Sequence, residues 1–191
     1  MIYNYGDCIK KYESKYNLDK AIANGRIYKI EKGIYSDKKN VSELDIISYK
    51  NKNAVFTKDS AYFYHQLTDY VPEKYYLATR KDDYKIKDKR IVQVFCLDKQ
   101  FDFGITEIKY EGTNIKIYDK ERMLVELARC KNKMPYDYYK EIVKSYRKIQ
   151  DELNMHNISE YSKYYANANT IMSVLLSEVF QWWYIFCRVK Y

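Results

Sequence analysis

The chain has 191 residues, 47% of them hydrophobic, which is enough to bury the core of one large domain or two small ones and excludes wholesale disorder. Its net charge of +8 favours polyanionic partners over basic ones. The four cysteines are far apart and there are only two histidines, so no zinc-ligand spacing is present.

The sequence also predicts where in the cell the protein is located. The N-terminus lacks the charged-then-apolar pattern of a signal peptide. The most apolar late stretch, residues 171–189, is interrupted by Ser173, Glu178 and Arg188. A membrane span needs roughly 20 largely apolar residues. Since scattered free thiols are typical of a reducing cytosol, we expect a cytoplasmic protein without a membrane partner.

The chain begins with a helical pattern. Ile2, Tyr5, Ile9 and Tyr12 recur at steps of three and four, which predicts a helix over residues 3–14. Asn17 is then a candidate N-cap for a second helix that buries Leu18, Ala21 and Ile22. Gly25 predicts the end of that helix, because glycine accepts the left-handed conformation.

A short basic hairpin follows the second helix. Residues 26–30 and 33–35 are rich in β-formers, and Gly33 completes the turn between them. Ser42 is a candidate cap for a third helix. A helix, a glycine and a basic hairpin in this order are typical of a winged helix-turn-helix. We therefore expect a DNA-binding domain over residues 1–53.

Five side chains are candidates for DNA contact. Lys20 and Asn24 are four residues apart and so share a helix face. Asparagine suits the adenine edge, and lysine suits guanine or phosphate. Arg26, Lys29 and Lys32 lie on the hairpin, where phosphate contacts are expected. The alternative is that all five are solvated charges on a module that packs against its neighbour.

From residue 54 the pattern changes to mixed strands and helices. A strand over residues 54–56 leads to a helix that Thr57 could cap, and the charged stretch 80–90 predicts a solvated loop. Further strands are predicted over residues 75–79, 91–97, 104–110 and 114–118. Asp119 could cap a helix, and others are expected around residues 139–153, 159–166 and 169–180.

The predicted fold class is α+β. An N-terminal winged helix-turn-helix would precede a mixed α/β domain over residues 54–191, which ends in a helical bundle.

Three blocks of sequence resemble the AbiEi-type abortive-infection antitoxin family. They are the hairpin at residues 25–35, residues 56–69 with Pro72 following, and residues 117–127 with their Glu-Arg helix opening. Their order and spacing agree with the family across roughly residues 5 to 176, and three blocks in order are more specific than any one of them. Residues 181–191 match no family pattern. They could extend the last helix into the core or form an oligomer contact.

The resemblance implies an antitoxin without enzymatic activity, cofactor or metal. The N-terminal domain would bind inverted repeats in its own promoter and repress the operon. The C-terminal domain would counteract a nucleotidyltransferase-like toxin, without necessarily forming a stable complex. Such type IV pairs defend against phage by abortive infection. The alternative is a transcriptional regulator without a toxin partner, and the oligomeric state stays open.

Two groups in the C-terminal domain are candidates for partner contact. Glu121 and Arg122 lie in the first turn after Asp119, and we expect Arg122 to pair with an acid in the adjacent sheet and orient the helices. A contact with toxin or nucleic acid is the alternative. Lys140, Lys144 and Lys148 follow helical spacing, as either a solvated face or a surface that meets acids or RNA.

The sequence offers only weak candidates for a catalytic site. Asp102, Glu107 and Lys109 approximate the metal ligands and lysine of a metal-dependent nuclease, which is a remote alternative. Asp102 is only five residues before Glu107, which is short for that arrangement. A solvated strand with alternating charges accounts for the same residues. Ser60 and His65 are five residues apart on one helix and point in different directions.

Overall fold

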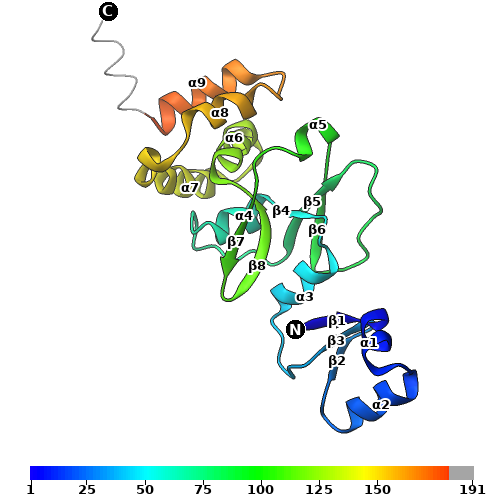
Figure 1. Ribbon diagram of the computed structural model, residues 1–191. Helices are drawn as coiled ribbons and strands as arrows, with labels where there is room; N and C mark the ends of the chain where they lie inside the picture. The colour runs from blue at the N-terminus through cyan, green and yellow to red at the C-terminus, as the bar shows by residue number, and fades with distance from the viewer. Residues whose placement is uncertain (181–191) are drawn as a thin grey trace, which may run out of the picture. The chain divides into compact units, whose positions relative to one another are not determined.

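The computed structural model describes residues 1–180 and contains helices and two β-sheets, which confirms the α+β class (Figure 1). The chain divides into two compact units. The first comprises Met1–Lys52 together with the turn Glu111–Asn114, and the second comprises the rest.

The first unit combines three helices with a three-stranded antiparallel sheet in the order β1-β3-β2. Its elements are β1 (Ile2–Asn4), α1 (Tyr5–Tyr12), α2 (Lys15–Ala23), β2 (Tyr28–Glu31), β3 (Ile34–Ser36) and α3 (Glu43–Lys50). The hairpin, the third helix and its Ser42 cap were predicted. Strand β1 was not, because its three residues also fit the helical stripe.

The start of α2 differs from the prediction. Ser14, not Asn17, is the N-cap, and its hydroxyl accepts the Asn17 N–H at 3.1 Å. Asn17 instead lies inside the first turn and donates its side-chain amide to the Tyr12 carbonyl at 3.0 Å. The prediction of Asn17 as the cap was wrong because both residue types cap helices and only the local backbone distinguishes them.

The core of the first unit holds the two N-terminal helices against the sheet. Cys8 of α1 and Leu18 of α2 are buried with Ile27 and Tyr35. Gly25 ends α2 as predicted, with φ +66°, and the next N–H reaches back to the Ala21 carbonyl at 2.9 Å. The sharp turn there sends the chain directly from the helix into the hairpin.

The second unit contains a five-stranded mixed sheet in the order β6-β5-β4-β8-β7. Its short central strand β4 is buried, antiparallel to β5 and parallel to β8. All five strands were predicted to within two residues. Their bounds are Val55–Phe56 for β4, Tyr75–Arg80 for β5, Ile91–Cys96 for β6, Ile105–Tyr110 for β7 and Thr113–Tyr118 for β8.

Helices surround and follow this sheet. Figure 1 shows α6 to α9 gathered together, and α6 packs against both α8 and α9. Asp119 caps α6 as predicted, because its carboxylate accepts the Arg122 N–H at 2.7 Å. The helices are α4 (Lys58–Tyr64), α5 (Asp98–Phe101), α6 (Lys120–Cys130), α7 (Tyr136–Lys148), α8 (Met155–Ser162) and α9 (Ala168–Glu178), with 3-10 turns at Lys131–Lys133 and Gln150–Glu152.

Three helices of this unit depart from the prediction. Helix α7 begins three residues earlier and ends five residues earlier than the predicted range 139–153, and a 3-10 turn follows it. Helix α8 begins four residues earlier than expected, because the Asn154 side chain accepts the N–H groups of His156 and Asn157. The short α5 was missed. Across residues 1–180, none of the helices combines the length and the apolarity that crossing a membrane requires. The aromatic segment 181–191 lies outside the described residues.

Candidate functional site

The predicted DNA-contact residues are all exposed in the first unit. Lys20 lies in the last turn of α2, and Asn24 is its C-cap, with its N–H donating to the Lys20 carbonyl at 3.0 Å. The two therefore keep helical spacing. Arg26 precedes β2, Lys29 lies within it, and Lys32 occupies the hairpin turn. None of the five is needed for the core of this unit.

The strand register places Lys29 on a defined face of the sheet. Lys29 pairs directly with Tyr35 of β3, and directly opposed residues of an antiparallel pair lie on the same face. Tyr35 packs in the core with Cys8 of α1 and Leu18 of α2. Lys29 therefore emerges on the face that carries the two helices, at the free edge of the sheet.

The structure adds two exposed side chains that sequence reasoning missed. Lys15 and Tyr16 form the first turn of α2, and Tyr16 is 74% exposed. Placing the cap at Asn17 left both outside the helix. The signal was available in Ser14, a preferred capping residue. It matters because the N-terminal residues of a recognition helix are those that contact base edges.

Arg122 is buried at the start of α6 in the second unit. Its guanidinium pairs with Glu126, one turn along the same helix, at 3.1 Å. The prediction that it pairs with an acid of the adjacent sheet was therefore wrong. The guanidinium instead lies 3.8 Å from the ring centre of Phe103 and 4.8 Å from that of Tyr118. Aromatic faces attract the cation and connect the helix to the sheet.

Glu126 and Glu121 extend this connection to the other helices. Burial by itself raises the pKa of Glu126, but Arg129 and Arg122 outweigh burial and hold that pKa below its usual value. Glu126 also accepts the Tyr165 hydroxyl at 2.6 Å. Glu121 accepts the backbone N–H of Asn154 at 2.9 Å. Both acids therefore anchor the segment around α8.

The basic residues of α7 lie on its exposed side. Lys140, Lys144 and Lys148 are exposed, and the Lys140 ammonium lies 4.5 Å from the ring centre of Tyr136. The buried side of the helix carries Tyr139, Ile142, Val143 and Tyr146. This arrangement suits a solvated face and a surface for an acidic or RNA partner equally well.

The residues of the nuclease alternative have other contacts. Asp102 pairs with Arg80, while Glu107 and Lys109 are exposed on β7. Within residues 1–180, no group of three His, Cys, Asp or Glu side chains could hold a metal ion.

Ser60 and His65 have structural contacts. The Ser60 hydroxyl accepts the Tyr76 N–H at 2.8 Å. His65 Nε2 lies 2.7 Å from the Tyr118 carbonyl, so we assign it as the protonated donor. Burial lowers the pKa of His65, which favours the neutral ring. The hypothesis of a packed or capping histidine accounts for these contacts.

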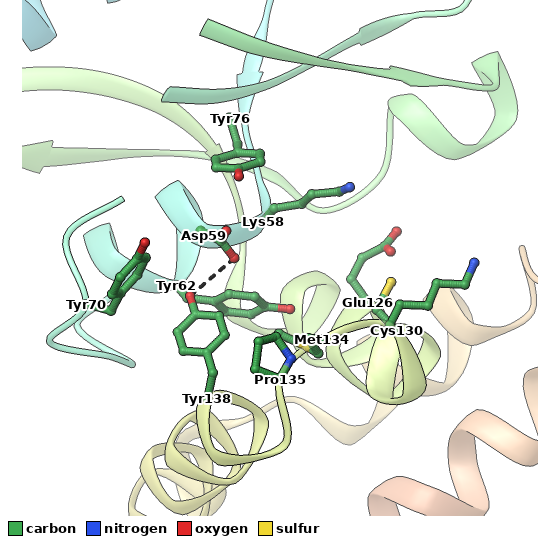
Figure 2. A pocket seen from close by; sticks show the side chains of 11 residues that line it. Lys58, Asp59, Tyr62, Tyr70, Tyr76, Glu126, Cys130, Met134, Pro135 and Tyr138 are labelled. Carbon is green, nitrogen blue, oxygen red and sulfur yellow. Dashed lines mark hydrogen bonds between the residues drawn. The ribbon is translucent and has the colours of Figure 1, made fainter. Parts of the chain in front are cut away.

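A pocket of about 520 Å³ in the second unit was not predicted (Figure 2). It brings together the start of α4, strand β5, the end of α6 and the start of α7. Sequence gave no signal for it, because its residues are distant along the chain. It is lined by Lys58, Asp59, Tyr62, Tyr70, Tyr76, Glu126, Cys130, Lys133, Met134, Pro135 and Tyr138.

Comparison with known proteins adds no assignment. No protein-family model and no curated protein sequence matches the chain.

Proposed function

We propose that the first unit is a winged helix-turn-helix that binds the promoter DNA of its own operon. The observation that carries the proposal is the order of its parts. Helices α1 and α2 are joined by two residues, Glu13 and Ser14, and lead through Gly25 into the basic hairpin β2–β3. Strand β3 lies between β1 and β2 in the sheet. This order of elements is compatible with a recognition helix that is followed by a wing.

The exposed cations supply the attraction to DNA in this proposal. Lys20, Arg26, Lys29 and Lys32 would neutralise backbone phosphates, which releases counterions and makes binding weaken steeply with salt. Tyr16 and Asn24 would face base edges from the two ends of α2. The phosphate contacts position the unit, and the base contacts select the sequence.

The test is promoter binding by the full chain at several salt concentrations. Replacing Lys20, Arg26, Lys29 and Lys32 with alanine should reduce the slope of log affinity against log salt by roughly 0.9 for each lost phosphate contact. The matched control replaces Lys81, Lys85, Lys87 and Lys89, four exposed lysines of the charged loop, and changes the net charge equally. Equal losses in both variants would refute a specific surface in the first unit.

The antitoxin role is proposed from the resemblance to the AbiEi-type family. In this proposal the second unit counteracts a nucleotidyltransferase-like toxin. Glu121 and Arg122 hold its helices in place, and the Lys140–Lys144–Lys148 face of α7 is available to a partner. The alternative is a regulator without a toxin. The adjacent gene discriminates between them: a nucleotidyltransferase that arrests growth, and whose arrest this chain relieves, supports the antitoxin. A neighbour whose expression leaves growth unchanged contradicts it.

A further inference from the structure

The pocket of the second unit has two chemically different ends. One end is aromatic and acidic: Figure 2 shows Tyr76 and Tyr138 on opposite sides of the Asp59 carboxylate, with Tyr70 and Tyr62 nearby. The other end carries Glu126, Cys130 and the extended side chain of Lys58. Lys133, the last residue of the 3-10 turn that follows Cys130, also lines the pocket. The Lys58 ammonium points away from Asp59 toward this second end.

No ion pair of the Asp59 carboxylate is found among residues 1–180, although the charge of the neighbouring Lys58 acts on it. The Tyr138 hydroxyl donates to it across 3.3 Å, and the Tyr76 hydroxyl also hydrogen-bonds to it. A carboxylate has about four acceptor positions, so two donors leave capacity for more. Burial raises the pKa of Asp59. Burial also raises the pKa of Tyr138, which keeps that hydroxyl protonated and donating. This half-buried carboxylate among aromatic rings can therefore accept further hydrogen bonds from a ligand.

Glu126, the carboxylate at the second end of the pocket, is already neutralised. Glu126 pairs with Arg122 and Arg129, at 3.1 Å and 2.5 Å. Lys58 and Lys133 are therefore the charges that this end offers to a ligand. Lys58 also holds φ at +46°, a left-handed conformation that is unfavourable for a residue with a side chain. Such strain persists where the surrounding structure imposes it, and it is concentrated at ligand sites.

We propose that this pocket binds a guanine nucleotide. The ring N–H and exocyclic amine of guanine are two adjacent donors that match the two oxygens of Asp59. The tyrosines would pack on the faces of the base, as aromatic side chains do in pockets that read extruded bases. Lys58 and Lys133 would meet the phosphate. A volume of about 520 Å³ lies within the range of small-molecule sites.

Other ligands fit less of the pocket. Adenine and cytosine place a ring acceptor beside their amine, which would face a carboxylate oxygen. Uracil offers one donor between two acceptors. A simple organic cation suits Asp59 and the rings but not the two lysines. This inference goes beyond the proposed function, because DNA binding by the first unit neither requires it nor follows from it.

Calorimetric titration of the full chain with GMP, AMP, CMP and UMP tests the proposal. GMP should bind about tenfold or more tightly than the others, the usual contribution of a good bidentate base contact. Asp59→Asn should abolish that preference, since an amide presents only one acceptor. Asp82→Asn is the matched control, an exposed acid outside the pocket, and should leave it unchanged. Tyr138→Phe, which keeps the ring, should retain the preference.

The phosphate contact has its own measurement. Lys58→Gln and Lys133→Gln should weaken GMP several-fold while leaving guanosine unaffected, and Lys87→Gln should change neither. Two RNA pentamers, with guanosine at the 5′ end or in the middle, identify the source of the base. Binding of the 5′-guanosine pentamer points to an RNA terminus, and binding of GMP without either pentamer points to a free nucleotide.

Three results would overturn the proposal. They are no binding of GMP or of either pentamer, equal binding of GMP and AMP, and an undiminished guanine preference in a folded Asp59→Asn variant. If that variant fails to fold, the comparison of the four nucleotides on the unmodified chain still decides. Promoter binding by the first unit is a separate test, and its failure would leave the nucleotide proposal unaffected.

Discussion

At the scale of single residues, Arg122 connects the start of α6 to its surroundings. It is 1% exposed, pairs with Glu126 and contacts three aromatic rings. The position is tightly packed, because a Cβ at Gly104 would lie 2.7 Å from the Arg122 Cβ. Glycine at 104, with φ +67°, therefore allows the chain before β7 to approach α6.

Replacing Arg122 with methionine should lower the free energy of unfolding by about 3 kcal/mol, because one partner of a buried ion pair is removed. Urea denaturation measures the change. The control is Lys120→Met, which breaks the exposed Lys120–Glu152 pair at 3.7 Å and should cost less than about 1 kcal/mol. A similar loss in both variants would contradict the anchoring role of Arg122.

The partly buried His65 should make the stability of the fold depend on pH. Burial lowers its pKa in the folded state below the usual 6.5, so the unfolded chain takes up the proton first. The stabilisation is present above about pH 6.5 and is lost as the pH falls. The stability difference between the natural chain and His65→Gln should therefore shrink on acidification. His156→Gln, which replaces an exposed histidine, is the control for the substitution itself.

At the scale of elements, the helix caps decide where the functional faces begin. Ser14 starts α2 and so includes Lys15 and Tyr16 in the candidate recognition helix. Ser14→Ala should destabilise the chain by about 1 kcal/mol, the usual cost of a lost N-cap. Asn17→Ala should cost less, because the helix keeps its cap. Thermal unfolding of the two variants compares them, and the reverse order would restore Asn17 as the cap.

Strands were easier to predict than helix boundaries. The five strands of the second unit are bounded by turn or charged residues, and β-formers concentrate within them. Helix α8 shifted because Asn154, Asn157 and Ser159 are all acceptable caps, and the contact from Glu121 favours the first. Strand β1 is stabilised only by its pairing with β3, which a three-residue pattern cannot reveal.

At the scale of the whole molecule, the proposed activities should be separable. The variant without Lys20, Arg26, Lys29 and Lys32 should lose repression of the promoter yet still relieve growth arrest by the toxin, since the first unit would serve only regulation. A reporter assay and co-expression with the adjacent gene measure the two outcomes. Loss of both in a folded, equally abundant variant would contradict the division of roles.

The sequence by itself determined the α+β class, the basic hairpin, most strands and the caps Ser42 and Asp119, because these depend on short-range patterns of burial, turns and capping. Tertiary structure decided the rest. Arg122 was recognised, but its partner was not, because the choice between Glu126 and a sheet acid depends on packing. The pocket around Asp59 joins residues that are far apart in the sequence, such as Asp59 and Tyr138, which are 79 positions apart. Only folding brings such residues together, and no local sequence pattern predicts the pocket that they form.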